Sequence, residues 1–391
     1  MQQIVHRQLD KLNALLEARA SSNDTFLRGK LGLIFYYYHL YKVTEQPEIK
    51  HRTEEMLEQV LANISSAVPG LAGAALSTGG AGFAYTVDFM QRESFLKFEV
   101  DNEFEELDKY LFNTAAALIA EDNIDYLHGA LGVTHYFASR ENATPLISGY
   151  LDELVVKICA RAVQEEAGCW FRNSLMKSGK KRTINLSLSH GLCGVLLVLI
   201  NAYEKSSHKA LILETVRAGV RFVLKHKMDV DFSRNEYTFF PFVLTQDARE
   251  ISAPNRMGWC YGDLNQVLLF YRAGRLLDDD NLRCLADLIG TQSMMRRDRQ
   301  STMVTEAHFC HGTAGLAQFC KTLYLESGAE VYREAYEHWI ERSVILLDDE
   351  LNNGAYNGRE HEFMEGLLGI AFVLLSYVSS IELEWSKAFL L

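Results

Sequence analysis

Gly29-Lys-Leu-Gly32 is followed directly by Leu33-Ile-Phe-Tyr-Tyr-Tyr-His-Leu-Tyr41, a run of apolar and aromatic residues. The same pairing of a Gly-x-x-Gly step with an apolar run recurs along the chain, with first glycines at positions 29, 79, 129, 191, 262, 312 and 366. In the fifth step Asn265 replaces the second glycine. Such near-regular recurrence predicts one supersecondary unit repeated seven times.

Each period contains two helical patterns. The runs after the glycines are apolar on nearly all sides, as in helices that are covered all round. A second pattern, as in 50–61 and 332–344, is amphipathic, with apolar residues at three- and four-residue spacing. This alternation predicts an all-α fold of two concentric layers, an α/α toroid of seven helical hairpins, with an open solenoid as the alternative. We expect the paired glycines to let neighbouring inner helices approach closely.

The repeats predict a single domain over residues 1–391, because stacked repeats form one continuous body. Two periods are longer than the others, with insertions near 165–186 and 229–256. Both insertions mix strand-forming residues with turn residues, so they are predicted to hold short β strands. Insertions in repeat proteins often form loops on the binding face.

Net charge, the N-terminal residues and the cysteine count limit the possible partners and the cellular compartment of this protein. The net charge of −12 argues against nucleic acid and against an anionic membrane surface as partners. The N-terminal residues lack a signal-peptide pattern, and the most apolar stretch, 366–378, is shorter than the roughly 20 residues that span a bilayer. We therefore expect a cytoplasmic protein. Its seven cysteines are then expected to be buried, metal-binding or catalytic rather than paired.

Alignment of the repeats places two cysteines at one position. Cys260 and Cys310 each stand two residues before a first glycine, and His311 follows Cys310. Two thiolates and an imidazole from neighbouring repeats predict a Cys₂His metal site, and three protein ligands with one open position are typical of catalytic zinc. The alternative is two ordinary buried thiols, which the shared position disfavours.

Other polar residues precede the same glycines and are expected around the same mouth. His190 is a candidate general acid or base, because an imidazole pKa of about 6.5 suits proton transfer near neutral pH. His128 occupies the equivalent position in the third repeat and is its rival. Asp125 and Arg256, taken alone, are typical of caps or surface ion pairs, and their position beside the mouth weakens that interpretation without reversing it.

Three blocks of this sequence, Ser189-His-Gly-Leu-Cys-Gly194, Arg256-Met-Gly-Trp-Cys-Tyr-Gly262 and Cys310-His-Gly-Thr-Ala-Gly315, resemble the lanthionine synthetase C family, the cyclases of lanthipeptide biosynthesis. The resemblance covers nearly the whole chain and implies an α/α toroid with zinc at its mouth. It implies two groups of site residues: zinc ligands Cys260, Cys310 and His311, and catalytic residues His190, Asp125, Arg256 and Tyr261. Asn265 departs from the family pattern, and we expect it to shift the start of the helix after Cys260.

The resemblance also implies a reaction and its partners. A cysteine thiol of a dehydrated precursor peptide, leader plus core, would bind the zinc, lose its proton and add to dehydroalanine or dehydrobutyrine, forming a thioether ring. His190 would protonate Cα, and Asp125 would orient His190 or assist proton transfer. Arg256 would stabilise negative charge or hold the peptide. The chain leaves no room for a dehydratase domain, so a separate dehydratase is the expected partner.

Other functions remain open at the level of sequence. A related toroid can add glutathione, rather than a cysteine of the peptide itself, to dehydroamino acids. A non-catalytic peptide-binding toroid is a second alternative, which the intact Cys, Cys, His positions disfavour. A prenyltransferase-like α/α barrel is a third, but such enzymes usually include an aspartate among their zinc ligands.

Overall fold

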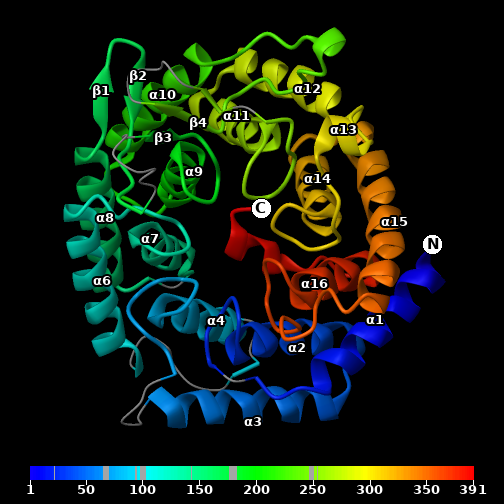
Figure 1. Ribbon diagram of the computed structural model, residues 1–391. Helices are drawn as coiled ribbons and strands as arrows, with labels where there is room; N and C mark the ends of the chain where they lie inside the picture. The colour runs from blue at the N-terminus through cyan, green and yellow to red at the C-terminus, as the bar shows by residue number, and fades with distance from the viewer. Residues whose placement is uncertain are drawn as a thin grey trace.

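The helices of the computed structural model form two concentric rings around a filled centre (Figure 1). The structure describes residues 1–21, 23–64, 70–92, 95–96, 103–141, 143–175, 183–245, 251–252 and 254–391. Within these ranges no helix combines the length and the apolar character needed to cross a membrane. The two-layer arrangement confirms the predicted α/α toroid.

The inner ring consists of the helices that follow the glycine steps. Each begins one residue after its first glycine: α2 (Lys30–Thr44), α4 (Gly80–Arg92), α7 (Ala130–Ser139), α9 (Leu192–Ala202), α11 (Asp263–Leu277), α14 (Thr313–Ser327) and α16 (Leu367–Val378). Each inner helix contacts the next one, and α16 returns to contact α2 (Figure 1). The ring is therefore closed, which excludes the open solenoid.

The outer ring consists of the amphipathic helices: α1 (Gln2–Glu17), α3 (Pro47–Ile64), α6 (Glu105–Ala120), α8 (Pro145–Ala160), α10 (Lys209–Lys225), α12 (Asp280–Met294) and α15 (Glu330–Asn352). Helix α1 precedes the first repeat in the chain but packs against α16 and α15 of the last repeats. The N-terminal helix thus supplies the outer partner of the seventh inner helix, and the two ends of the repeat array meet.

The second glycine of each step packs against the turn of its own repeat. A Cβ on Gly315 would lie 1.8 Å from the carbonyl oxygen of Phe309, and one on Gly369 would lie 2.2 Å from that of Phe363. The second-nearest atom to a Cβ on Gly369 comes from the turn of the neighbouring repeat: Phe309 Cβ, at 2.7 Å. At Gly32 the neighbouring inner helix itself is close, because Leu368 Cδ2 of α16 lies 2.8 Å from the Cβ position. The expected close approach of neighbouring inner helices is therefore found at Gly32, whereas Gly315 and Gly369 pack against turns.

The two insertions hold the predicted short strands. β1 (Val163–Glu165) and β2 (Gly168–Trp170) form an antiparallel hairpin. β3 (Thr183–Asn185), β4 (Val243–Thr245) and β5 (Ile251–Ser252) form a three-stranded antiparallel sheet. Because β3 lies in the first insertion and β4 and β5 in the second, the two insertions pair with each other. A short helical segment, η1 (Phe232–Arg234), lies in the second insertion, and another, α13 (Arg299–Thr302), lies between α12 and α14.

The centre of the ring is filled by the C-terminal segment, η2 (Glu384–Phe389) and the two residues after it (Figure 1). The Tyr126 hydroxyl donates a hydrogen bond to the carbonyl of Ala388 (2.8 Å). Trp259 Nε1 donates another to the carbonyl of Phe389 (2.9 Å). These contacts tie the C-terminus to the turns that carry Asp125 and Cys260.

Replacing Trp385 by alanine is expected to lower the free energy of unfolding by about 3–5 kcal/mol, the usual cost of truncating a buried Trp. The Trp385 side chain is completely buried against aromatic residues of the inner ring, and Nε1 donates to Ser376 Oγ (2.7 Å). Denaturant unfolding measures the loss, with Lys387→Ala, on the exposed side of the same segment, as the control. Equal stability of the two variants would contradict the central role of the segment.

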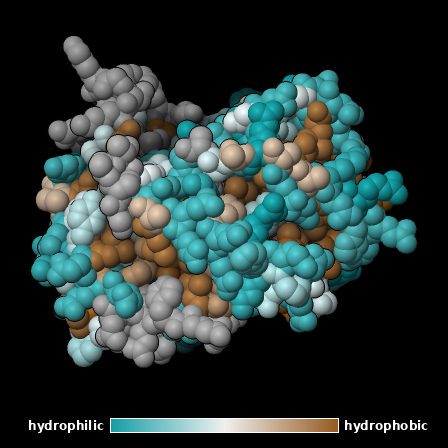
Figure 2. Space-filling view, turned by 90° about the horizontal axis from the view of Figure 1, so that it is seen from below, coloured by the Kyte–Doolittle hydropathy of each residue, from teal (hydrophilic) through white to brown (hydrophobic). Residues whose placement is uncertain are grey.

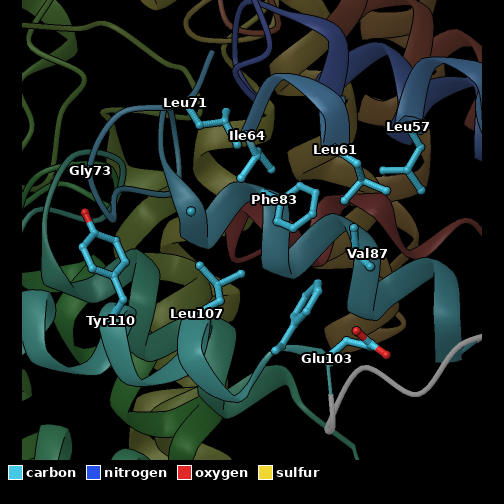
Figure 3. A pocket seen from close by; sticks show the side chains of 12 residues that line it. Leu57, Leu61, Ile64, Leu71, Gly73, Phe83, Val87, Glu103, Leu107 and Tyr110 are labelled. Carbon is cyan, nitrogen blue, oxygen red and sulfur yellow. The ribbon is translucent and has the colours of Figure 1, made fainter. Parts of the chain in front are cut away.

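An apolar cavity of about 510 Å³ lies between the outer helices α3 and α6 and the inner helix α4. Side chains of these three helices form most of its wall (Figure 3): Leu57, Leu61 and Ile64 of α3, Phe83 and Val87 of α4, and Leu107 and Tyr110 of α6. Figure 2 shows the face of the molecule on which α3 lies, where hydrophobic residues emerge between hydrophilic ones. None of the predicted site residues lines this cavity.

Candidate active site

The turns before the glycines form a hydrogen-bonded circle at one end of the ring. The residues two before each glycine are linked through their backbones, Leu27 N to Ser77 O, Ser77 N to Leu127 O, Cys260 N to Cys310 O and Cys310 N to Met364 O, and Phe363 N closes the circle on Leu27 O. Between the third and fifth repeats side chains take over: His190 Nδ1 pairs with Asp125 Oδ2 (2.6 Å), and Ser189 Oγ donates to the Cys260 carbonyl (3.4 Å). This circle places the aligned side chains at one mouth.

Cys260, Cys310 and His311 lie together, as predicted. Their ligand atoms are all within 4.8 Å of one another. Cys260 is buried, whereas Cys310 and His311 are half-buried, so the group is reachable from one side. Gly258 allows this packing, because a Cβ there would lie only 2.8 Å from the Cα of His311.

The pKa values of the two thiols are shifted in opposite directions by their contact with each other. A hydrogen bond from Cys310 lowers the pKa of Cys260 below its ordinary value, against the effect of burial, and His311 lowers it further. The same shared hydrogen bond raises the pKa of Cys310, and burial adds to the rise. A thiolate beside a thiol and an imidazole is a donor set that suits zinc, with a tetrahedral position left for a fourth ligand. The residues present therefore fit the metal that the sequence predicts.

His190 and Asp125 form a hydrogen-bonded pair. His190 Nδ1 lies 2.6 Å from Asp125 Oδ2, and the carboxylate is completely buried. Burial alone would lower the pKa of His190, but the hydrogen bond and charge of Asp125 outweigh it and raise that pKa. Burial would raise the pKa of Asp125, but the same pairing and the backbone amide of His128 lower it. The imidazole is thus held in one orientation with its second nitrogen free of this pairing.

Asn173, which sequence reasoning missed, holds this pair in place. Its Nδ2 donates to Asp125 Oδ2 (3.1 Å) and to the backbone carbonyl of His190 (2.9 Å). Asn173 lies in the first long insertion, outside the repeat, so no aligned position marks it. The insertion itself was the available signal, because it was expected on the binding face.

His128, the rival of His190, has a different environment. Its Nδ1 pairs with Ser77 Oγ (2.9 Å), and its ring is stacked against that of His190 with centroids 6.2 Å apart. Burial lowers the pKa of His128, although Asp125 opposes the shift. His128 lacks the direct carboxylate hydrogen bond that holds His190.

Arg256 and Tyr261 flank Cys260 in the same turn. Arg256 is half-buried, and its charge acts on Cys310. The Tyr261 ring stacks on Phe242 of the second insertion (5.0 Å), and its hydroxyl accepts a hydrogen bond from Asn185 Nδ2 (3.3 Å). Both residues therefore belong to the turn of Cys260, and neither forms a hydrogen bond with His190 or Asp125 among the described interactions.

A buried ion pair anchors the turn that carries these residues. Arg296 Nη1 donates to Asp263 Oδ2 (3.2 Å), and Arg296 also donates to the carbonyl of Asn255. Asp263 accepts the backbone amides of Phe239 and Phe240 (both 3.0 Å). The start of α11, the second insertion and the segment before Arg256 thereby form one unit.

Asn265 does not shift the following helix, contrary to our expectation. Helix α11 begins one residue after Gly262, as the other inner helices do after their glycines. Asn265 Nδ2 donates to the carbonyl of Trp259 (3.0 Å), and Oδ1 accepts the amide of Leu188 (2.9 Å). The fifth repeat differs from the others at Gly262 instead. The φ of Gly262 is 120°, a conformation that favours glycine. Asn265 thus links the turn of Cys260 to the turn of His190.

Comparisons with known proteins show which family model and which solved structure this chain resembles. The family model described as "Lanthionine synthetase C-like protein" matches residues 20–390. The solved structure of nisin cyclase is similar with a TM-score of 0.78 at 18% identity, covering 99% of this chain and 96% of that one. Comparison with curated proteins gives no match. Since the family model spans nearly the whole chain, the protein belongs to the lanthionine synthetase C-like family.

Proposed function

We propose that this protein is a zinc-dependent lanthipeptide cyclase that forms thioether rings in a dehydrated precursor peptide. The observation that carries the proposal is the meeting of two groups at one mouth: the donors Cys260, Cys310 and His311, and the hydrogen-bonded pair of His190 and Asp125. The first group suits thiol activation and the second suits proton transfer. Family membership and the fold shared with nisin cyclase support the same reaction class.

Cys260, Cys310 and His311 would hold the zinc, with the open side of the group facing the peptide. When bound, zinc supplies the acidity that ionises a coordinating thiol near neutral pH. A free thiol has a pKa of about 8.5 and is mostly protonated there. The three protein donors would orient the reacting sulfur toward the rest of the mouth.

His190 would deliver the second half of the addition. The peptide sulfur forms a bond to Cβ of the dehydro residue, the C=C electron pair moves to Cα, and His190 donates a proton there. One S–H is thereby added across one double bond, with no oxidant or reductant. Asp125 holds His190 Nδ1, so Nε2 is the nitrogen left for the substrate.

Arg256, Tyr261 and His128 would complete the mouth. Arg256 places a cation where negative charge develops on the substrate carbonyl. Tyr261, fixed by Phe242 and Asn185, would restrict the position of the peptide. His128 would support the His190 ring through stacking. A separate dehydratase would supply the substrate, and the free state of all seven cysteines agrees with a cytoplasmic site of action.

The test is to incubate the purified protein with a dehydrated peptide that carries one cysteine, with glutathione present. Ring formation leaves the peptide mass unchanged and removes one thiol that can be alkylated. Glutathione addition instead raises the mass by one glutathione and would assign the related activity. Peptide that is bound but chemically unchanged would identify a binding toroid and overturn the proposal.

A further inference from the structure

A carboxylate outside the predicted ligand set lies against His311. Glu306 Oε2 is 3.6 Å from His311 Nε2 and 2.7 Å from His308 Nε2. The rings of His308 and His311 meet edge to face, with centroids 4.3 Å apart. The carboxylate therefore forms a hydrogen bond with His308 and lies just beyond hydrogen-bond distance of His311, one of the proposed zinc ligands.

His308 fixes this carboxylate from the buried side. His308 is 5% exposed, and among the described residues its Nδ1 is buried with no hydrogen-bond partner. A proton on Nδ1 would be a buried, unpaired donor, which costs free energy. The proton therefore belongs on Nε2, from which it is donated to Glu306. Glu306 is thereby anchored, although half of its side chain is exposed.

We propose that Glu306 is a positioning residue for the zinc ligand His311. It accepts the Nε2 proton of His311, which leaves Nδ1 as the nitrogen for the metal and sets the angle of the ring. This hydrogen bond requires the 3.6 Å separation to shorten, which the proposal assigns to a small rotation of the half-exposed Glu306 side chain that keeps its bond to His308. Carboxylates in this role orient metal-bound imidazoles and raise their basicity. The inference rests on the zinc site of the proposed function.

The repeat places Glu306 opposite a residue already in the site. Glu306 stands six residues before Gly312, and Arg256 stands six before Gly262. Equivalent positions in neighbouring repeats therefore carry opposite charges, each ahead of one of the two cysteines. In this proposal Arg256 acts on the substrate, and Glu306 acts on the zinc ligand His311.

The experiment measures zinc affinity by competition with a chromophoric chelator, together with the melting temperature of the zinc-free protein. Glu306→Ala is expected to weaken zinc binding by about 10–100-fold, the usual effect of losing such a partner. Glu306→Gln keeps an acceptor oxygen and is expected to retain most of the affinity. Glu362→Ala is the matched control, because Glu362 lies in the next turn and pairs with Arg28 (3.7 Å) instead.

The outcomes separate this inference from the proposed function. Zinc bound by the wild type and by Glu306→Ala with equal affinity would overturn the role of Glu306 alone. A wild type that binds no zinc would overturn both. A zinc-free Glu306→Ala variant that melts well below the zinc-free wild type would assign Glu306 to the stability of the turn, and the positioning role would fail.

Discussion

Replacing Cys310 by alanine is expected to remove the bound zinc and to lower the cyclisation rate by at least about 30-fold. The metal is lost because one of three protein donors is gone, and Cys260 also loses the hydrogen bond that favours its thiolate. The rate falls because a few per cent of a free thiol is ionised at neutral pH, so the peptide sulfur reacts mostly from its protonated form.

Elemental mass spectrometry of the purified protein, prepared without chelator, measures the first effect. About one zinc per chain is expected in the wild type and a residual amount in the variant. Cys284→Ala is the matched control, because Cys284 is an exposed free cysteine on the outer helix α12 and should leave both zinc and rate unchanged. Zinc retained in Cys310→Ala would remove this residue from the ligand set and weaken the catalytic interpretation.

The predictable site residues are those that occupy equivalent positions in the aligned repeats. Cys260 and Cys310 occupy one aligned position, and the backbone hydrogen bond between them shows why equal positions become neighbours at one mouth. The same reasoning placed His190 and Asp125 near each other. It did not decide between His190 and His128, since both share one position and only side-chain partners distinguish them.

The parts that were not predictable depend on contacts across long distances in the chain. Asn173 comes from an insertion that has no register with the repeats, and the C-terminal segment reaches Trp259 and Tyr126 through the centre of the ring. The effect of Asn265 was misjudged because only its departure from the family glycine was considered, and not the hydrogen bonds of its side chain. In the structure its amide makes two hydrogen bonds that replace the close packing seen at Gly315 and Gly369.

Replacing His190 by asparagine is expected to lower the cyclisation rate by about 10²–10⁴-fold while leaving the zinc content unchanged, the usual range for losing a general acid or base. Asparagine can still donate a hydrogen bond to Asp125 but has no proton to deliver at Cα. The residual product should also lose stereochemical control, because solvent can protonate the carbanion from either face. Chromatography of the hydrolysed rings against lanthionine standards measures the ratio of epimers.

Asp125→Asn tests whether the charge of Asp125 acts through His190, and His128→Asn tests which of the two histidines donates the proton. Asp125 raises the pKa of His190, so the protonated donor persists to higher pH than it would alone. Removing that charge in Asp125→Asn lowers this pKa, and the loss of rate on raising the pH should then begin at a lower pH. His128→Asn should cost less than His190→Asn, since His128 pairs with Ser77 rather than with a carboxylate. If His128→Asn instead abolished cyclisation while His190→Asn kept its rate and its stereochemistry, the proton donor would be His128, and the carboxylate pair would serve only to hold the turn in place.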